Sequence, residues 1–491
     1  MELRQAGHSA IEISAALKAE GMALNRTGVA EVLAEEGFER LSTRPFRERV
    51  LPRRGELPRA QVLAFDALAP VCDTVSGGLL LAIPDLVALD LPALVRAAGY
   101  AGTRAIPATS YVLSLLALKL VGIRRVSHVD DLAADPGAGL FAGLTALPKA
   151  TALSTYSYRG HHQQQRRFLT ALDSSMIKAG LTTPGEAIFD LDFHAIMHWG
   201  TDPALEKHYV PTRSQRSRSM LTFFAQDSAT HNLVYANADL SQAAQNREVI
   251  AFCDHWRQAT GTDPHMLVMD QKVTTQPILG ELDERGIKFL TLRMRSTALI
   301  RQIEALPKDA WKTVALDREG KYRRPKVAEQ TEVALSNYPG TVRQLIVTGL
   351  GREAPTVIIT NDYDTSTKKL IERYARRMCI EQRLAESIRA FHLDALAGAV
   401  NLNIDLDVVL SVLAGAACAA LRRRLPGYAT ATPDTLQRRF IETSGKIINN
   451  GDRITVRLDR RTYSPVLRQS DIPEATTVPW WGNRELRFEY T

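Results

Sequence analysis

The chain has 491 residues, 45% of them hydrophobic and 23% charged, and a formal net charge of +7. This length is too great for one hydrophobic core, so we expect several domains. The composition is ordinary for a globular protein, and we find no internal repeat or low-complexity tract. Basic residues form four clusters; any one is usually a solvated face, but together they favour a polyanionic partner over a membrane. The clusters are Arg44, Arg47, Arg49, Arg53 and Arg54; Arg213, Arg216 and Arg218; Lys321, Arg323, Arg324 and Lys326; and Arg422, Arg423 and Arg424.

Cysteine usage and apolar runs predict the compartment. The four cysteines are scattered without a C-x-x-C pair, which argues against zinc and for the reducing cytoplasm. No secretory signal opens the chain. The longest apolar run, 408–421, has 14 residues, too few to cross a bilayer, and predicts a buried helix.

Residues 1–42 predict a helix-turn-helix DNA-binding region. Ser9 and Glu12 form a capping-box pattern, and Asn25 is suited to cap a second helix after the break at Gly21. Arg26 and Thr27 would then begin a recognition helix, with a generic helical hairpin as the alternative.

A basic, proline-punctuated linker follows over 43–59 and includes Arg53 and Arg54, which we expect to follow a phosphate backbone. Residues 60–185 have helical periodicity, predict an all-helical region and carry no catalytic motif. From residue 186 the sequence pattern becomes typical of strands. The segment 186–199 alternates, with Asp190 and Asp192 on one face.

The next segments predict an α/β core. Two more strands form a meander, and after a helix the buried strand 265–270 ends in Asp270; a helix and another strand follow. This order describes an RNase H-like catalytic core, over 186–295 and again over 356–425. Residues 296–355 predict a β-rich insertion between its parts, and residues 426–491 a tail with a hairpin at Asn450-Gly451.

The helix predicted from Arg373 onward places one glutamate, Glu381, at the edge of its apolar stripe. Glu372 and Glu386 are expected to face water. A carboxylate beside a core is costly unless it is paired or liganded. Two interpretations stand: an Arg377–Glu381 salt bridge, or an acid held to bind metal.

Three acids fit a metal-dependent site. Asp192 lies on the first core strand, Asp270 at the end of a buried strand, and Glu381 on a helix expected to pack on the same sheet. Carboxylate oxygens suit Mg²⁺ or Mn²⁺, and two such ions can activate an attacking water or 3′-hydroxyl in phosphodiester displacement. Asp190 is the alternative first acid.

The pattern Tyr374-x₂-Arg377-x₃-Glu381 resembles part of the Y-x₂-R-x₃-E-x₆-K signature of a large class of bacterial insertion-sequence transposases with DDE chemistry. The segments LDFHAIMHWG and VMDQKVTTQPILGELDERGIKFLTLRMR resemble the first- and second-aspartate strands of the class, and a β insertion before the glutamate is typical of it. The resemblance covers about residues 186–425. One position departs: Ile388 stands where the signature has lysine, and Arg389 beside it is the candidate to make that DNA contact instead.

The resemblance implies a DNA transposase that nicks transposon ends by metal-dependent hydrolysis and joins the 3′-hydroxyl to target DNA, acting as a homodimer on double-stranded DNA. Asp192, Asp270 and Glu381 would be the catalytic acids and would hold two Mg²⁺ or Mn²⁺ ions. Tyr374 and Arg377 would contact the transposon end. Trp311, in the insertion, would stack on a flipped base.

Three other functions were weighed. A transposon-derived DNA-binding protein without cleavage activity fits Ile388 but not the three acids. A tyrosine recombinase using Tyr463 would need an Arg/His-x-x-Arg constellation, which we do not find. A simple repressor would explain residues 1–42 but leave the acids without a role.

Overall fold

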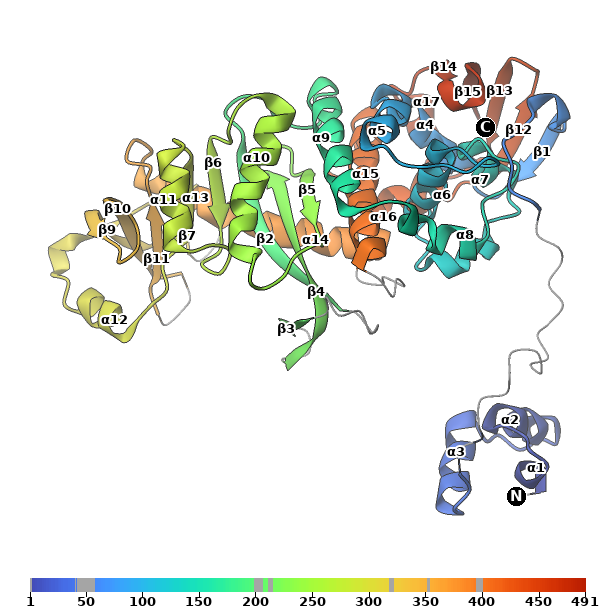
Figure 1. The fold of residues 1–491 in the computed structure, drawn as a ribbon, viewed down its shortest axis with the longest axis horizontal. Coiled ribbons are helices and arrows are strands. Elements are labelled where there is room, and N and C mark those ends of the chain that lie inside the picture. The colour runs from blue at the N-terminus through green and yellow to red at the C-terminus, as the bar shows by residue number, and fades with distance from the viewer. Residues whose placement is uncertain are drawn as a thin grey trace. The chain divides into compact units, whose positions relative to one another are not determined.

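The computed structural model describes residues 2–39, 41, 58–197, 206–210, 215–317, 322–350, 354–393 and 401–491. The chain forms two compact units, Met1–Glu56 and Leu57–Thr491. The fold is mixed α/β, and both units appear in Figure 1.

The N-terminal unit contains three helices, α1 (Glu2–Gln5), α2 (Ala10–Ala19) and α3 (Arg26–Glu35). The predicted capping box is confirmed, because Ser9 and Glu12 bond each other's backbone amides. Asn25 caps α3 as expected. Ile13, Val29 and Leu33 form a small core of their own. The sequence did not predict α1.

A ten-stranded mixed sheet dominates the second unit. Its strands are β2 (Ile188–Met197), β3 (Glu206–Val210), β4 (Gln215–Asp227), β5 (Leu233–Asn237), β6 (Met266–Met269), β7 (Lys288–Leu292), β8 (Trp311–Thr313), β9 (Lys326–Ala334), β10 (Thr341–Thr348) and β11 (Thr356–Thr360). The order is β3-β4-β2-β6-β7-β11-β10-β9-β8, with β5 also paired to β4. Strands β2, β6 and β7 are parallel neighbours, and the other pairs are antiparallel.

Helices cover this sheet and present apolar faces to it. They are α9 (His162–Lys178), α10 (Glu248–Thr260), α11 (Gln276–Glu284), α12 (Thr297–Glu304), α13 (Thr367–Arg376), α14 (Met378–Phe391) and α15 (Asn401–Arg424). In the core, Phe189 of β2 packs edge-on against Phe252 and Trp256 of α10. This contact fixes the strand that carries Asp190 and Asp192.

Residues 296–355 supply strands β8 to β10, as expected for a β-rich segment. These strands extend the same sheet through β11, because β10 pairs with β11 over Arg343 to Val347. Strand β8 is short and ends at Thr313.

A second, five-stranded sheet has the order β1-β12-β13-β15-β14. Its strands are β1 (Val71–Thr74), β12 (Gly445–Asn449), β13 (Arg453–Leu458), β14 (Thr476–Val478) and β15 (Arg484–Tyr490). The predicted hairpin at Asn450-Gly451 is confirmed, and Gly451 has φ +79°, which favours glycine. The expectation of an all-helical region over 60–185 is wrong at β1, whose partner lies near the other end of the sequence.

The remaining regular elements of the second unit are mostly short helices. They are α4 (Ile83–Ala88), α5 (Leu91–Ala98), α6 (Ala108–Leu120), α7 (Pro136–Phe141), α8 (Ala150–Ser154), α16 (Pro433–Leu436) and α17 (Ser464–Arg468), with the short helical turns η2 (Phe65–Ala67), η3 (Gly77–Ala82), η4 (Val126–Asp131), η5 (Tyr156–Arg159), η7 (Gln245–Arg247), η8 (Lys308–Ala310), η9 (Gln437–Ile441) and η10 (Pro479–Trp481).

Among the described residues, one helix, Leu402–Arg424, is long and apolar enough to cross a membrane by length and composition, and the bent pair Gly77–Ala88 and Leu91–Ala98 passes the same test if taken as one span. The apolar stretch of Leu402–Arg424 is 83% buried inside the structure. It packs against α6, α9 and β5, as the sequence predicts for a buried helix.

Candidate active site

Strand register places Asp192 and Asp270 side by side. Strands β2 and β6 run parallel, and Leu191 is paired with Met269. The next residue after each of these two is an aspartate. Neighbouring strands lie about 4.8 Å apart. Each carboxylate accepts a hydrogen bond from the following backbone amide, at 2.9 Å from Phe193 and 2.8 Å from Gln271.

Glu381 reaches the same region from the first turn of α14. The structure differs here from the single helix expected, because α13 ends at Arg376 and α14 begins at Met378. At the break, the amide of Arg377 bonds the carbonyl of Tyr374, and the carbonyl of Arg377 accepts from Ile380. Such i to i+3 bonds tighten the helix locally and bend its course.

Arg377 joins two of the three acids. Its Nη2 lies 3.1 Å from Glu381 Oε1, and its Nη1 lies 3.7 Å from Asp192 Oδ2. The Arg377 side chain is only 8% exposed, whereas Glu381 is 46% exposed. The salt bridge that the sequence allowed is therefore present, but Arg377 is shared with Asp192.

The charges of the three acids also act on one another. We call Asp192, Asp270, Glu381 and Arg377 the carboxylate cluster. Burial raises the pKa of Asp192 to about 6, with further increases from the charges of Glu381 and Asp270, against the opposing effect of Arg377. Burial by itself would lower the pKa of Arg377, but Tyr374 and the three carboxylates raise it. Each acid thus lies close enough for its charge to act on the same guanidinium.

The donor set fits a hard divalent cation. Three carboxylates are ligands that Mg²⁺ and Mn²⁺ prefer, and a cation would stabilise the ionised form of Asp192 that its surroundings disfavour. Among the described residues, no group of three His, Cys, Asp or Glu side chains is already drawn together at metal-binding spacing. In this structure the three acids surround Arg377, and their carboxylates would have to move closer together to share one ion.

Asp190, the alternative first acid, has a different environment. It is fully buried, lies 2.6 Å from Arg373 Nη2 and accepts a 3.0 Å hydrogen bond from Ser228. Its carboxylate is thus already paired, which favours Asp192 as the first acid of the site. The sequence did not predict this role for Arg373, although it lies one helical turn before Arg377.

The other predicted DNA-contacting residues of the second unit lie near or beyond this cluster. The Tyr374 ring is 5.8 Å from the Arg377 guanidinium carbon. Arg389 is exposed on α14, whereas Ile388 packs against the hydrophobic core. Trp311 is half-buried against the small core that contains Leu299.

In the N-terminal unit, Arg26 and Thr27 are exposed at the start of α3. Arg53 and Arg54 lie outside the described residues.

The expectation that Glu386 faces water is wrong. Its side chain is 2% exposed and accepts hydrogen bonds from Arg383 at 2.5 Å and Gln382 at 3.1 Å. These partners, three and four residues away on the same helix, make burial of the charge tolerable.

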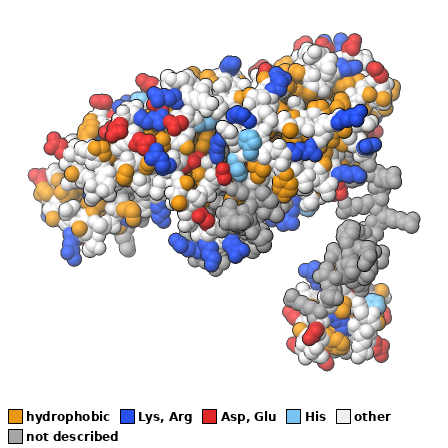
Figure 2. Space-filling view, viewed as in Figure 1, with side chains coloured by type: hydrophobic (Ala, Val, Ile, Leu, Met, Phe, Trp, Pro, Cys, Tyr) orange, Lys and Arg blue, Asp and Glu red, His pale blue; other side chains and the backbone are white. Residues whose placement is uncertain are grey.

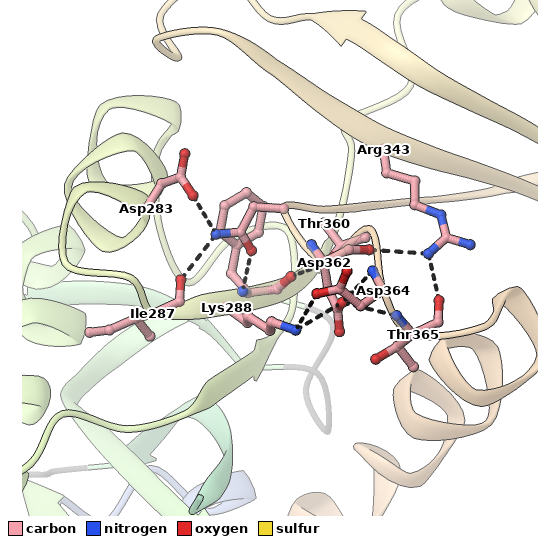
Figure 3. A network of polar contacts seen from close by, with 10 residues as sticks. Asp283, Ile287, Lys288, Arg343, Thr360, Asp362, Asp364 and Thr365 are labelled. Carbon is pink, nitrogen blue, oxygen red and sulfur yellow. Dashed lines mark hydrogen bonds and ion pairs between the residues drawn. The ribbon is translucent and has the colours of Figure 1, made fainter.

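A second polar cluster holds the loop between β11 and α13 and so positions the helix that leads to Arg377 (Figure 3). Asp362 is 1% exposed and accepts bonds from Lys288 and from the amides of Asp364 and Thr365, each at 3.1 Å. Arg343 donates to the carbonyls of Asp362 and Thr365. We call this set the loop network.

Glu329 completes the loop network. It accepts from Arg343 Nε at 2.8 Å and from the Thr367 hydroxyl at 2.6 Å, which ties β9 to the first turn of α13. Burial would raise the pKa of Asp362 and of Glu329, but their hydrogen bonds and neighbouring cations lower both pKa values.

Comparisons with known proteins add little to this geometry. No family profile and no curated protein sequence matches the chain. Among solved structures, the chain is similar to a piggyBac transposase in a synaptic complex with hairpin DNA, with a TM-score of 0.40 and 10% identity over 74% of this chain and 76% of that one. A likeness at this level carries no functional conclusion, so the proposal below depends on the residues themselves.

Proposed function

We propose that this chain is a DDE transposase with an RNase H-like core, which binds transposon ends, nicks them and transfers the 3′-hydroxyl to target DNA. The observation that carries the proposal is the placement of Asp192, Asp270 and Glu381 around one arginine from three separate elements. The order β5-β4-β2-β6-β7 supports the core assignment, since three antiparallel strands precede parallel strands linked by helices.

Asp192, Asp270 and Glu381 would hold two Mg²⁺ or Mn²⁺ ions. When bound, the ions lower the pKa of an attacking water or hydroxyl and stabilise charge on the leaving oxygen. Asp192 and Asp270 are suited to this role because strand register and backbone amides fix their carboxylates. Glu381 is the most exposed of the three and sits just after the helix break, where a small movement of α14 would bring it inward.

Arg377 and Tyr374 would position the DNA strand beside the acids. In the protein alone, Arg377 balances the carboxylate charges. Among the described residues, its buried Nε and Nη1 have no hydrogen-bond partner, so these donors would bind a phosphate once the cluster opens to DNA. Arg389, further along α14, would contact the phosphate backbone of the DNA. Trp311 would stack on a displaced base.

The N-terminal unit would recognise the transposon ends as a helix-turn-helix, with Arg26 and Thr27 at the DNA, and the protein would act as a homodimer. A truncation that begins near Ala60 should then lose tight binding to transposon ends and keep divalent-cation binding. Equal binding of ends by the truncated and full chains would contradict this role.

The central test uses DNA that flanks the gene as the substrate and the full chain in Mg²⁺. Asp192→Asn, Asp270→Asn and Glu381→Gln should each lower strand cleavage by about 10³-fold, because a metal ion contributes several kcal/mol to the transition state. Binding of the ends should remain. The matched control is Glu372→Gln on α13, whose carboxylate accepts a bond from the Asp317 amide and lies near Lys368, away from the three acids.

Mn²⁺ binding, followed by electron paramagnetic resonance, gives a second readout that does not require the correct DNA. The three acid variants should bind Mn²⁺ more weakly than the control variant. If any one of them cuts at the wild-type rate, its catalytic role is wrong. A protein that binds flanking DNA but neither cuts it nor binds Mn²⁺ would instead be a transposon-derived DNA-binding protein, which the apolar packing of Ile388 in place of the signature lysine favours.

A further inference from the structure

A two-stranded ribbon projects from the sheet that carries Asp192 (Figure 1). It consists of β3 and the first part of β4, paired antiparallel from Glu206 opposite Ser219 to Val210 opposite Gln215. The base of the ribbon is anchored, because the Gln242 amide donates to Glu206 at 2.8 Å and the Gln242 side chain donates to the Lys207 carbonyl at 3.2 Å. The ribbon is therefore a fixed extension of the sheet at its base.

One face of this ribbon is basic. Side chains alternate between the two faces of a strand, so positions 207, 209, 216 and 218 share a face. Lys207, Arg216 and Arg218 stand at three of these four positions, and all three are exposed. No acidic residue stands on this face, whereas the opposite face begins with Glu206. Figure 2 shows lysine and arginine side chains gathered at the lower edge of the second unit, where β3 and β4 project in Figure 1.

The basic face lacks internal compensation. Lys207 is directly opposite Arg218, and like charges at opposed positions destabilise an antiparallel pair. Within the described part of the chain, no ion pair joins Lys207, Arg216 or Arg218 to an acid. An external anion would remove the repulsion, whereas an ordinary solvated face would normally intersperse acids among its cations.

The ribbon extends from the edge of the sheet where the candidate acids lie. Asp192 is paired with Phe224 on β4, and Arg218 lies six residues before Phe224 on the same strand. At about 3.4 Å per residue the separation is roughly 20 Å, less than one turn of B-DNA. Strand β6 ends beside Asp192, so β3 and β4 continue past the carboxylate cluster.

We infer that the basic face of this ribbon, Lys207, Arg216 and Arg218, binds the phosphate backbone of duplex DNA that runs past the carboxylate cluster, without reading its sequence. Phosphate contacts by Lys and Arg position a duplex and carry no sequence information. The inference rests on the proposed function, since it takes DNA as the substrate. It adds a contact surface in the second unit that is separate from the helix-turn-helix and from α14.

The test measures the salt dependence of binding to random-sequence duplex DNA between about 50 and 200 mM salt. The full chain is compared with the triple variant Lys207→Gln, Arg216→Gln, Arg218→Gln. Loss of three phosphate contacts should reduce the magnitude of the slope of log K against log salt by about two to three. The matched control, Arg96→Gln, Arg104→Gln, Lys149→Gln, removes the same charge at exposed positions of the helical region and should leave the slope unchanged.

A single variant guards against a folding artefact. Lys207→Glu places opposite charges across from each other, so its melting temperature should not fall, while its affinity for duplex DNA should fall further than that of Lys207→Gln. An unchanged slope in the triple variant, an equal loss in the control triple, or a change in oligomeric state without a change in DNA binding would each overturn the inference.

The outcomes also separate this inference from the proposed function. Cleavage of end DNA and Mn²⁺ binding report on the acids, whereas the slope on random DNA reports on the ribbon. A ribbon variant with the wild-type slope in a protein that still cuts DNA would refute the ribbon alone. A chain whose slope depends on the ribbon but which neither cuts DNA nor binds Mn²⁺ would refute the cleavage function alone.

Discussion

The two polar clusters along α13 and α14 differ in how their charges are compensated. In the loop network, Asp362 and Glu329 each receive several donors, and their pKa values are lowered. In the carboxylate cluster, burial and neighbouring acids raise the pKa of Asp192 to about 6 although Arg377 is adjacent. The carboxylates of the loop network are fully paired, as structural ion pairs are. The carboxylate cluster keeps negative charge that a bound cation would neutralise.

The largest expected effect on stability lies in the loop network. Arg343→Met removes the donor to Glu329 and to the carbonyls of Asp362 and Thr365. Because it leaves buried groups without partners, we expect the free energy of unfolding to fall by about 3–5 kcal/mol. Urea denaturation measures this, with the exposed Arg295→Met as control, which should cost less than about 1 kcal/mol. Equal losses in the two variants would show that the loop network is not structural.

The free energy of unfolding should change with pH in opposite directions for the two clusters. The pKa of Asp192 rises from 3.8 to about 6 on folding, so the unfolded chain ionises first and this residue makes stability fall as pH rises from about 4 to 6. Asp192→Asn should remove that fall, on the order of 2–3 kcal/mol above pH 6 without divalent cations.

The pKa of Asp362 is lowered, so its contribution is present above pH 3.8 and is lost as pH falls through the folded value. Asp362→Asn should therefore remove stability at neutral pH and flatten the acid limb. Urea midpoints between pH 3 and 7 test both variants. A steep fall between pH 4 and 6 that persists in Asp192→Asn would contradict the assignment for the carboxylate cluster.

The smallest expected effect on stability separates the two interpretations of Glu381. Its side chain is 46% exposed, and Arg377 would keep its contact with Asp192, so Glu381→Gln should cost less than about 1 kcal/mol. A structural salt bridge to a buried arginine would instead cost roughly 3–5 kcal/mol. Melting temperature and cleavage are measured on the same preparation. A protein that melts far lower yet cuts at the wild-type rate would refute the catalytic role.

Periodicity and strand order were enough to predict several features. The alternation around Asp192 and the apolar run before Asp270 predicted two strands of one sheet, whereas their parallel register is known only from the structure. The capping box at Ser9 and the Asn450-Gly451 turn were local signals, and local signals were reliable here because their partners lie within a few residues.

Features that depend on distant or unusual partners were not predictable. No Gly or Pro stands near the helix break at Arg377, so the sequence did not predict it. Burial of Glu386 depends on the packing of α14, which helical period alone did not reveal. Strand β3, with the polar sequence EKHYV, resembles a loop in composition, and β1 forms an edge strand only because β12 is available. Each miss reflects tertiary context overriding local pattern.

The pairing of β1 with β12 has a consequence for synthesis. Val71 pairs with Ile448, 377 positions later, and Leu458 pairs with Tyr490 at the far end of the described chain. At synthesis rates of about 5–20 residues per second, β1 waits roughly 20–75 seconds on the ribosome before its partner exists. The five-stranded sheet therefore closes only after nearly all of the chain has been made. A nascent chain therefore cannot complete its second unit until residues 445–490 have been made, and a premature stop codon before residue 445 would leave β1 without its partner strand.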